Sequence, residues 1–168
     1  MLELLERPAL VRGPVITHLP AQTMAVVYTV GNPEESEHRA MAALYSSFLE
    51  MRRKRLENGE RLPIGVLRVR WLNSRDAPSH IWLGAWGLQI PSDVTSMPQV
   101  MHDLAVKVET WSYGTVVEIV HEGPRSAQEE TLDELSHYIA QSEYTAVGEF
   151  EEEYQAPPRT ICGEVTFR

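Results

Sequence analysis

Cysteine is almost absent from this chain of 168 residues, since Cys162 is its single thiol. An internal disulfide is therefore excluded, as is typical of proteins from a reducing compartment. No stretch is long and apolar enough to cross a membrane. Residues 1–14 lack the basic region and apolar core of a signal peptide. Together these absences predict a cytoplasmic protein that does not associate with membranes.

Basic charge is also scarce, because 15 Lys and Arg residues face 24 Asp and Glu residues, for a net charge of −9. The only basic run, Arg52 to Arg55, lies at the end of a predicted helix, where basic side chains are common. Contacts to nucleic-acid phosphates need clustered Lys and Arg. Direct nucleic-acid binding is therefore not expected, and cationic ligands suit the acidic chain better.

Motifs of metal, nucleophile and phosphate chemistry are missing as well. The six histidines show no paired spacing that suits a metal, and no Gly-x-Ser-x-Gly turn or phosphate-binding loop occurs. No metal site and no cofactor are expected. His121 ends a predicted strand beside a turn, so we expect it to hydrogen-bond that turn rather than act as a base.

What is present is an order of elements that occurs twice: strand, helix, strand, strand. The predicted elements are residues 23–30, 37–56, 64–72 and 80–90 in the first half, and 115–121, a helix from Thr131, 147–155 and 161–167 in the second. The second helix opens with a capping-box pattern, Thr131-x-x-Glu134. Two such halves can share one antiparallel sheet with both helices on one side.

This pattern predicts an α+β fold of tandem strand-helix-strand-strand modules related by pseudo-twofold symmetry. We expect one domain over residues 1–168, with module one at about 15–91, a linker at about 91–104 and module two at about 105–168. The groove between two such modules is a natural place for a ligand. Two copies of the chain could also pair as a homodimer.

Two of the predicted strands align with each other when Ile64 is set against Val147, an offset of 83 residues (147 − 64 = 83). Trp71 then matches Tyr154, and Val69 matches Glu152. Because side chains alternate along a strand, Glu152 shares the apolar face with its aromatic neighbours. We interpret Glu152 as an inward-facing acid that is kept for a ligand, since burying an unpaired charge is costly.

A plainer interpretation stays open for the same strand. A bulge or a register slip would turn Glu152 outward and leave Glu151 to Glu153 as a solvated edge. In the inward interpretation, the face opposite to Glu152 carries Glu149, Glu151 and Glu153 and is expected to be solvated.

Aromatic side chains supply the expected walls of a ligand site, because they attract flat and cationic molecules. All four tryptophans lie between Trp71 and Trp111. Each aromatic taken alone is more simply explained as core packing. Trp71 and Tyr154, which the repeat matches, are the best candidates for facing walls. The candidate ligand-binding residues are Glu152, Tyr154, Phe150, Trp71, Trp82, Trp86, Trp111, Tyr113 and Tyr28.

The second half resembles the GyrI-like small-molecule-binding family, part of the multidrug-binding effector domain superfamily. The resemblance rests on EIVHEGP (Glu118 to Pro124), on LDELSHYIA (Leu132 to Ala140) and on the Glu-x-Tyr of Glu152 and Tyr154 followed by proline. The first half contributes LPAQTMAVVYTVG, which looks like the family's opening strand. The order and spacing of these segments are more specific than any single one.

The resemblance implies binding of flat, hydrophobic or cationic drug-like molecules between two modules, with Glu152 as the key contact. Some stand-alone family members hydrolyse the cyclopropane ring of DNA-alkylating natural products, which would make Glu152 and Tyr154 catalytic here. Another member inhibits DNA gyrase. We favour binding, keep the hydrolase as the alternative, and find no surface determinant in the sequence for the inhibitor.

The sequence departs from the family pattern at three points. It carries no DNA-binding domain, so it is not expected to be a complete transcription factor. Arg125 stands where the family often has an aromatic residue after Gly-Pro, and Pro157-Pro158 replaces the usual Asp-Pro. The last two departures concern the loops and leave the expected fold unchanged.

Overall fold

The computed structural model describes residues 13–73, 77–148, 150–154 and 163–167. Its elements follow the chain in this order: β1 (Val15–Leu19), β2 (Gln22–Val30), α1 (Pro33–Glu57), β3 (Leu67–Trp71), the short 3-10 turn η1 (Ser79–Ile81), β4 (Leu83–Gln89), β5 (Lys107–Trp111), β6 (Gly114–Gly123), the 3-10 turn η2 (Arg125–Ala127), α2 (Gln128–Gln141), β7 (Phe150–Tyr154) and β8 (Gly163–Phe167). Among the described helices, none is long and apolar enough to cross a membrane.

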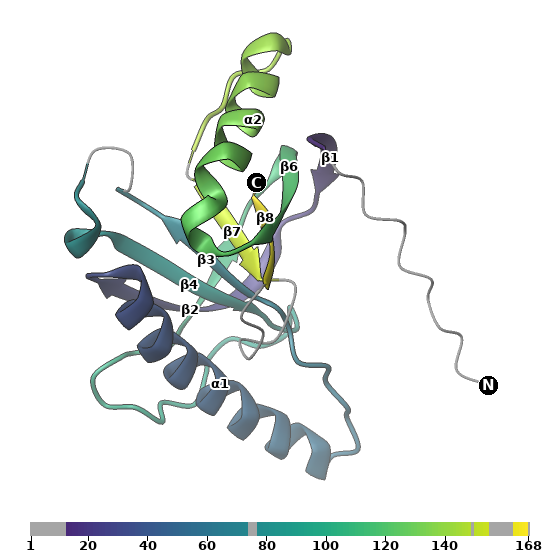
Figure 1. The fold of residues 1–168 in the computed structure, drawn as a ribbon. Coiled ribbons are helices and arrows are strands. Elements are labelled where there is room, and N and C mark those ends of the chain that lie inside the picture. The colour runs from purple at the N-terminus through teal and green to yellow at the C-terminus, as the bar shows by residue number, and fades with distance from the viewer. Residues whose placement is uncertain (1–12, 74–76, 149, 155–162, 168) are drawn as a thin grey trace.

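The strands form one eight-stranded sheet in the order β1-β6-β8-β7-β3-β4-β2-β5, and neighbouring strands are antiparallel. Both helices lie on the same face of this sheet (Figure 1). Phe150 and Tyr154 of β7 show this directly, since they pack against the α1 cluster and against the α2 cluster. The predicted α+β architecture, with two helices on one side of an antiparallel sheet, is confirmed.

Two strands were not predicted, and together they tie the modules to each other. β1 pairs with β6 of the second module, and β5 pairs with β2 of the first. The chain bends between β1 and β2 and again between β5 and β6. The pairing register continues unchanged across these bends, from Leu19↔Gly114 in the β1–β6 pair to Gln22↔Trp111 in the β2–β5 pair. Each module is therefore strand, strand, helix, strand, strand, and its first strand lies at the edge of the other module's sheet.

The first helix begins earlier than predicted, at Pro33 rather than Glu37. Asn32 caps it, because its side-chain oxygen accepts a hydrogen bond from the Glu34 backbone N–H at 3.0 Å. Proline suits the first helical position, where its missing N–H costs nothing. Acidic residues in the first turn and basic residues in the last turn complement the helix dipole.

The predicted capping box at Thr131 is wrong, because α2 already begins at Gln128. The Thr131 hydroxyl instead lies 2.8 Å from Nδ1 of His121. Nε2 of this buried histidine lies 3.2 Å from the Pro124 carbonyl oxygen. His121 therefore holds the turn between β6 and α2, as expected from its position in the sequence.

The main core lies between α1 and the sheet. Its buried members include Leu44, Phe48, Val69, Trp71 and Trp86. The predicted linker belongs to this core, since Val94, Met97 and Leu104 are buried in it. Val106, just after the linker, is buried there as well. A smaller cluster lies under α2 and contains Ile119 and Leu135.

Candidate functional site

Glu152 lies at the centre of the sheet, where the two modules meet. β7 of module two pairs with β3 of module one, and the partner of Glu152 is Val69. The pairs run without a bulge from Arg68↔Glu153 to Trp71↔Phe150. Glu152 is only 3% exposed. The prediction that this acid points inward is confirmed, and the register-slip alternative is wrong.

The Glu152 carboxylate has a donor on each oxygen. Nε1 of Trp71 donates to Oε1 at 3.0 Å, and the Tyr154 hydroxyl donates to Oε2 at 3.0 Å. Nη2 of Arg125 lies 3.7 Å from Oε2 and forms an ion pair with it. We expected a ligand to supply the missing counter-charge of a buried acid. That expectation is corrected, because Arg125 already supplies one.

Arg125 connects three groups from both modules. Its Nη2 donates to the Tyr154 hydroxyl and, at 3.2 Å, to Oε2 of Glu37 on α1. Its side chain is 33% exposed, whereas that of Glu152 is 5% exposed. The arginine is thus the accessible end of this set of contacts. Two carboxylates share one guanidinium, so the formal charges of Glu37, Glu152 and Arg125 sum to −1 when both acids are ionised.

The pKa values in this cluster follow from burial and charge. Burial, and then the charge of Glu152, raise the pKa of Tyr154 well above its ordinary value, so the phenol keeps its proton. Burial also raises the pKa of Glu37, although Arg125 opposes the shift. Burial alone would lower the pKa of Arg125, but Tyr154, Glu152 and Glu37 outweigh it and raise that pKa.

The aromatic side chains beside Glu152 touch one another. The Trp71 ring lies 5.2 Å from that of Trp82 and 5.4 Å from that of Trp86, centroid to centroid. Trp86 stacks at 18° against Tyr154, with centroids 6.5 Å apart. Trp86 is held in place by a 2.8 Å hydrogen bond from its Nε1 to the Thr29 hydroxyl. Phe150, the cross-strand partner of Trp71, completes the group.

A glycine makes room for this cluster. A Cβ atom added at Gly84 would lie 2.7 Å from Nε1 of Trp86 and 3.0 Å from Trp71. Both rings are fully buried and cannot move aside freely. The close approach of the β4 backbone to the two tryptophans therefore requires glycine at this position.

Three of the predicted site residues lie elsewhere. Trp111 and Tyr113 pack on the opposite face of the sheet, in the cluster with Met24 and Val26. Tyr28 is 37% exposed, and its hydroxyl donates to Glu109 at 2.9 Å. The structure brings Trp71, Trp82, Trp86, Phe150 and Tyr154 together near Glu152, and it separates Trp111, Tyr113 and Tyr28 from it.

The opposite face holds a buried charge network rather than a solvated row of acids. Glu151 is 2% and Glu153 is 5% exposed, which corrects the expectation for both, while Glu149 lies outside the described residues. Nε of Arg68 donates to Glu153 at 2.7 Å, and Nε of Arg70 donates to Glu151 at 2.8 Å.

This network is covered by the bend between β5 and β6. The Tyr113 hydroxyl donates to Glu151 at 3.0 Å, and Trp111 lies 4.1 Å below the Arg70 guanidinium. The paired segments β1–β2 and β5–β6 thus cross the central strands β3 and β7 on the face that carries Arg70 and Glu151. These two aromatic residues shield ion pairs on the face of the sheet opposite to the Glu152 side chain.

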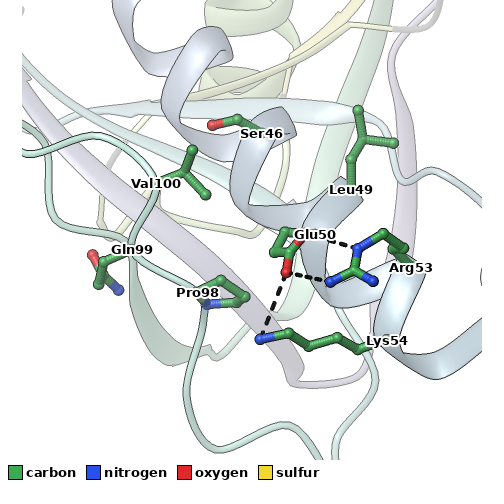
Figure 2. Close-up of a pocket in the computed structure, with 8 residues that line it drawn as sticks. All are labelled: Ser46, Leu49, Glu50, Arg53, Lys54, Pro98, Gln99 and Val100. Atoms are coloured by element: carbon green, nitrogen blue, oxygen red, sulfur yellow. Dashed lines mark hydrogen bonds and ion pairs between the residues drawn. The ribbon is translucent and has the colours of Figure 1, made fainter.

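An open groove of about 750 Å³ lies on the outer side of α1, against residues 98–100 (Figure 2). It is lined by Ser46, Leu49, Glu50, Arg53, Lys54, Pro98, Gln99 and Val100. Its acid is already paired, since Glu50 contacts both Arg53 and Lys54. Among the described residues that line it, none is aromatic and none belongs to the Glu152 cluster. Over the described part of the chain, no group of acids, histidines and cysteines could hold a metal ion.

No protein-family model and no curated protein matches the chain. Solved structures do match. An uncharacterized conserved protein from Listeria innocua superposes with a TM-score of 0.77 at 20% identity, covering 95% of this chain and 93% of that one. A hydrolase from Listeria innocua superposes with a TM-score of 0.76 at 19% identity, covering 95% and 92%.

The C-terminal domain of EcmrR superposes with a TM-score of 0.68 at 8% identity, covering 92% of this chain and 93% of that domain. At these identities the comparisons establish the fold, which this chain shares with the two Listeria innocua proteins and with the C-terminal domain of EcmrR. The resemblance to the GyrI-like family stays a prediction.

Proposed function

We propose that the chain binds flat aromatic molecules that carry a positive charge, at the junction of its two modules. The observation that carries the proposal is the buried Glu152 carboxylate beside Trp71, Trp86 and Tyr154. Aromatic faces attract a cation by roughly 0.5–2 kcal/mol each. The net negative charge of the Glu37, Glu152 and Arg125 group favours one additional cation. The fold shared with the C-terminal domain of EcmrR supports ligand binding in general.

Replacing the acid tests this proposal. Glu152→Gln keeps the shape of the side chain but removes its charge, so the affinity for ethidium, a flat aromatic cation, should fall about 10- to 100-fold. This corresponds to about 1.5–3 kcal/mol for a hydrogen bond to a charged group. Isothermal titration calorimetry with the wild-type and variant proteins measures the difference directly.

Glu50→Gln is the matched control, because Glu50 is the acid of the open groove on α1. Ethidium affinity should be the same in this variant as in the wild type. If Glu50→Gln weakens binding and Glu152→Gln does not, the ligand site is the groove of Figure 2 and the proposal is wrong.

A second candidate function is hydrolysis at the same place. The adjacent carboxylate of Glu152 and phenol of Tyr154 favour it, as does the fold shared with a hydrolase from Listeria innocua. Glu152 would take a proton from a water molecule as its oxygen bonds to a carbon of a strained cyclopropane ring. The ring C–C bond would break, and its electron pair would pass to the oxygen of a carbonyl group conjugated with the ring, where the Tyr154 hydroxyl would stabilise the enolate charge. The proton held by Glu152 would then return to the product, so that the substrate gains one water.

Mass spectrometry distinguishes catalysis from binding. If the chain is a hydrolase, a neutral cyclopropane-bearing DNA alkylator should gain the mass of one water faster with the protein than without it. Glu152→Gln and Tyr154→Phe should each slow this reaction about 100-fold or more. An alkylator that stays intact while ethidium still binds excludes the hydrolase and leaves binding as the function.

A further inference from the structure

The guanidinium of Arg125 is the cationic group that lies beside the Glu152 carboxylate. Its Nη2 contacts the Tyr154 hydroxyl and is 3.7 Å from Glu152, the acid assigned to the ligand. The same nitrogen is closer to Glu37, at 3.2 Å. Arg125 therefore has two acidic partners, and it can release one of them without losing the other.

We propose that Arg125 is a built-in competitor for the cation site: its guanidinium neutralises Glu152 in the free protein and stays with Glu37 alone when a cationic ligand binds. This inference rests on the proposed binding function and adds the residue that sets its selectivity. Glu37 takes part in this exchange because it keeps an ion pair with Arg125 after the arginine has left Glu152. With ligand bound, two acids face two cations, and the cluster is neutral.

The position of Arg125 in the chain suits such a movement. It begins the short turn η2, directly after Gly123 and Pro124, and its side chain is partly exposed. Glu37 lies near the start of α1 in the other module, and its side chain is 22% exposed. Glu152, by contrast, is fixed in the central strand and receives hydrogen bonds from Trp71 and Tyr154. The mobile partner in an exchange is therefore the arginine.

An internal competitor weakens the apparent affinity for a ligand, because only the fraction of molecules with a free site can bind it. The apparent dissociation constant is the intrinsic constant divided by that fraction. Arg125→Ala removes the competitor, so ethidium should bind about tenfold or more tightly than to the wild type. Phenanthridine is the uncharged ring system of ethidium and does not compete for charge. Its affinity should change less than about threefold. Calorimetric titration of both compounds gives the four constants.

Glu37→Gln should act in the opposite direction. Without the Glu37 carboxylate, Arg125 has Glu152 as its remaining acidic partner in the cluster, and a cation must displace it without compensation. Ethidium affinity should fall about tenfold, while phenanthridine affinity stays within about threefold of the wild type. A simple loosening of the site would change the binding of both compounds and would not change sign between the two variants.

Arg125→Gln provides a second test that keeps the length of the side chain, in case the alanine variant folds poorly. It should also tighten ethidium binding. If the variants bind both compounds but neither arginine variant gains affinity for ethidium, the competitor is overturned and the binding function stands. If no protein, wild type or variant, binds either compound, the binding function fails and the competitor fails with it.

Discussion

Arg68→Met should lower the free energy of unfolding by about 3–5 kcal/mol, the cost of removing one partner from a buried ion pair. The side chain is 7% exposed, and its Nε lies 2.7 Å from Oε2 of Glu153. Its Nη1 also donates to the Tyr113 hydroxyl at 3.1 Å and to Gln22. One substitution therefore removes the donor that joins β3, β7, β2 and the bend after β5.

Urea denaturation followed by far-UV circular dichroism measures this loss. Arg53→Met is the matched control, because Arg53 is paired with Glu50 and Glu57 on α1 but is 58% exposed. Exposed pairs contribute about 0–1 kcal/mol, so the control should be nearly as stable as the wild type. The double variant Arg68→Met/Glu153→Leu should recover most of the stability, since apolar residues can replace a buried pair. Equal losses at positions 68 and 53 would contradict the buried network.

Trp86→Ala should cost about 3–5 kcal/mol of folding stability, the range for removing a large aromatic side chain from a packed core. Trp86 is fully buried and packs on Trp71 and Tyr154. It also donates to the buried Thr29 hydroxyl, which would lose this partner. Because Trp86 supports both the core and the stacked face of Tyr154, the variant should also bind ethidium more weakly.

Trp82→Ala is the comparison for this prediction. Trp82 touches the same Trp71 ring but is only partly buried. Its removal should cost clearly less than that of Trp86 in the same urea titration. A loss at Trp86 no larger than the loss at Trp82 would show that the tryptophan cluster is not a rigid core, and Trp86 would then be better explained as a flexible wall of the ligand site.

The position of Glu152 could be predicted because two independent patterns agreed on it. Strand alternation placed it among aromatic residues, and the 83-residue offset matched it to an apolar residue, Val69. Its burial follows from both. The burial of Glu151 and Glu153 could not be predicted. Acids that alternate with aromatic residues along a strand are expected to face solvent, unless Arg68 and Arg70 are known to lie opposite them on the neighbouring strand.

The missed strands have a related cause. β1 and β5 are each five residues long, and their pairing partners belong to the other module. A local pattern contains no information about such a distant partner. Trp111 and Tyr113 were assigned to the ligand site for the same reason, since only the bend between β5 and β6 places them on the opposite face.

Arg125 was visible in the sequence as a departure from the family pattern, but its role was not. Whether an arginine after a turn points to solvent or to a buried acid depends on tertiary structure. Glu37 had no signal of its own, because an acid near the start of a helix is common. The pairing of these two residues is a property of the contact between the modules and not of either segment.

The pairing of Val69 with Glu152 has a consequence for how such a protein can be built. These residues are matched by the repeat and are also direct cross-strand partners, so the pseudo-twofold axis passes between them. In a true homodimer of one module, the same residue would stand on both sides of that axis. Two glutamates directly opposite each other would repel. A single central acid therefore requires two modules that differ at this position, and joining the modules in one chain allows this difference.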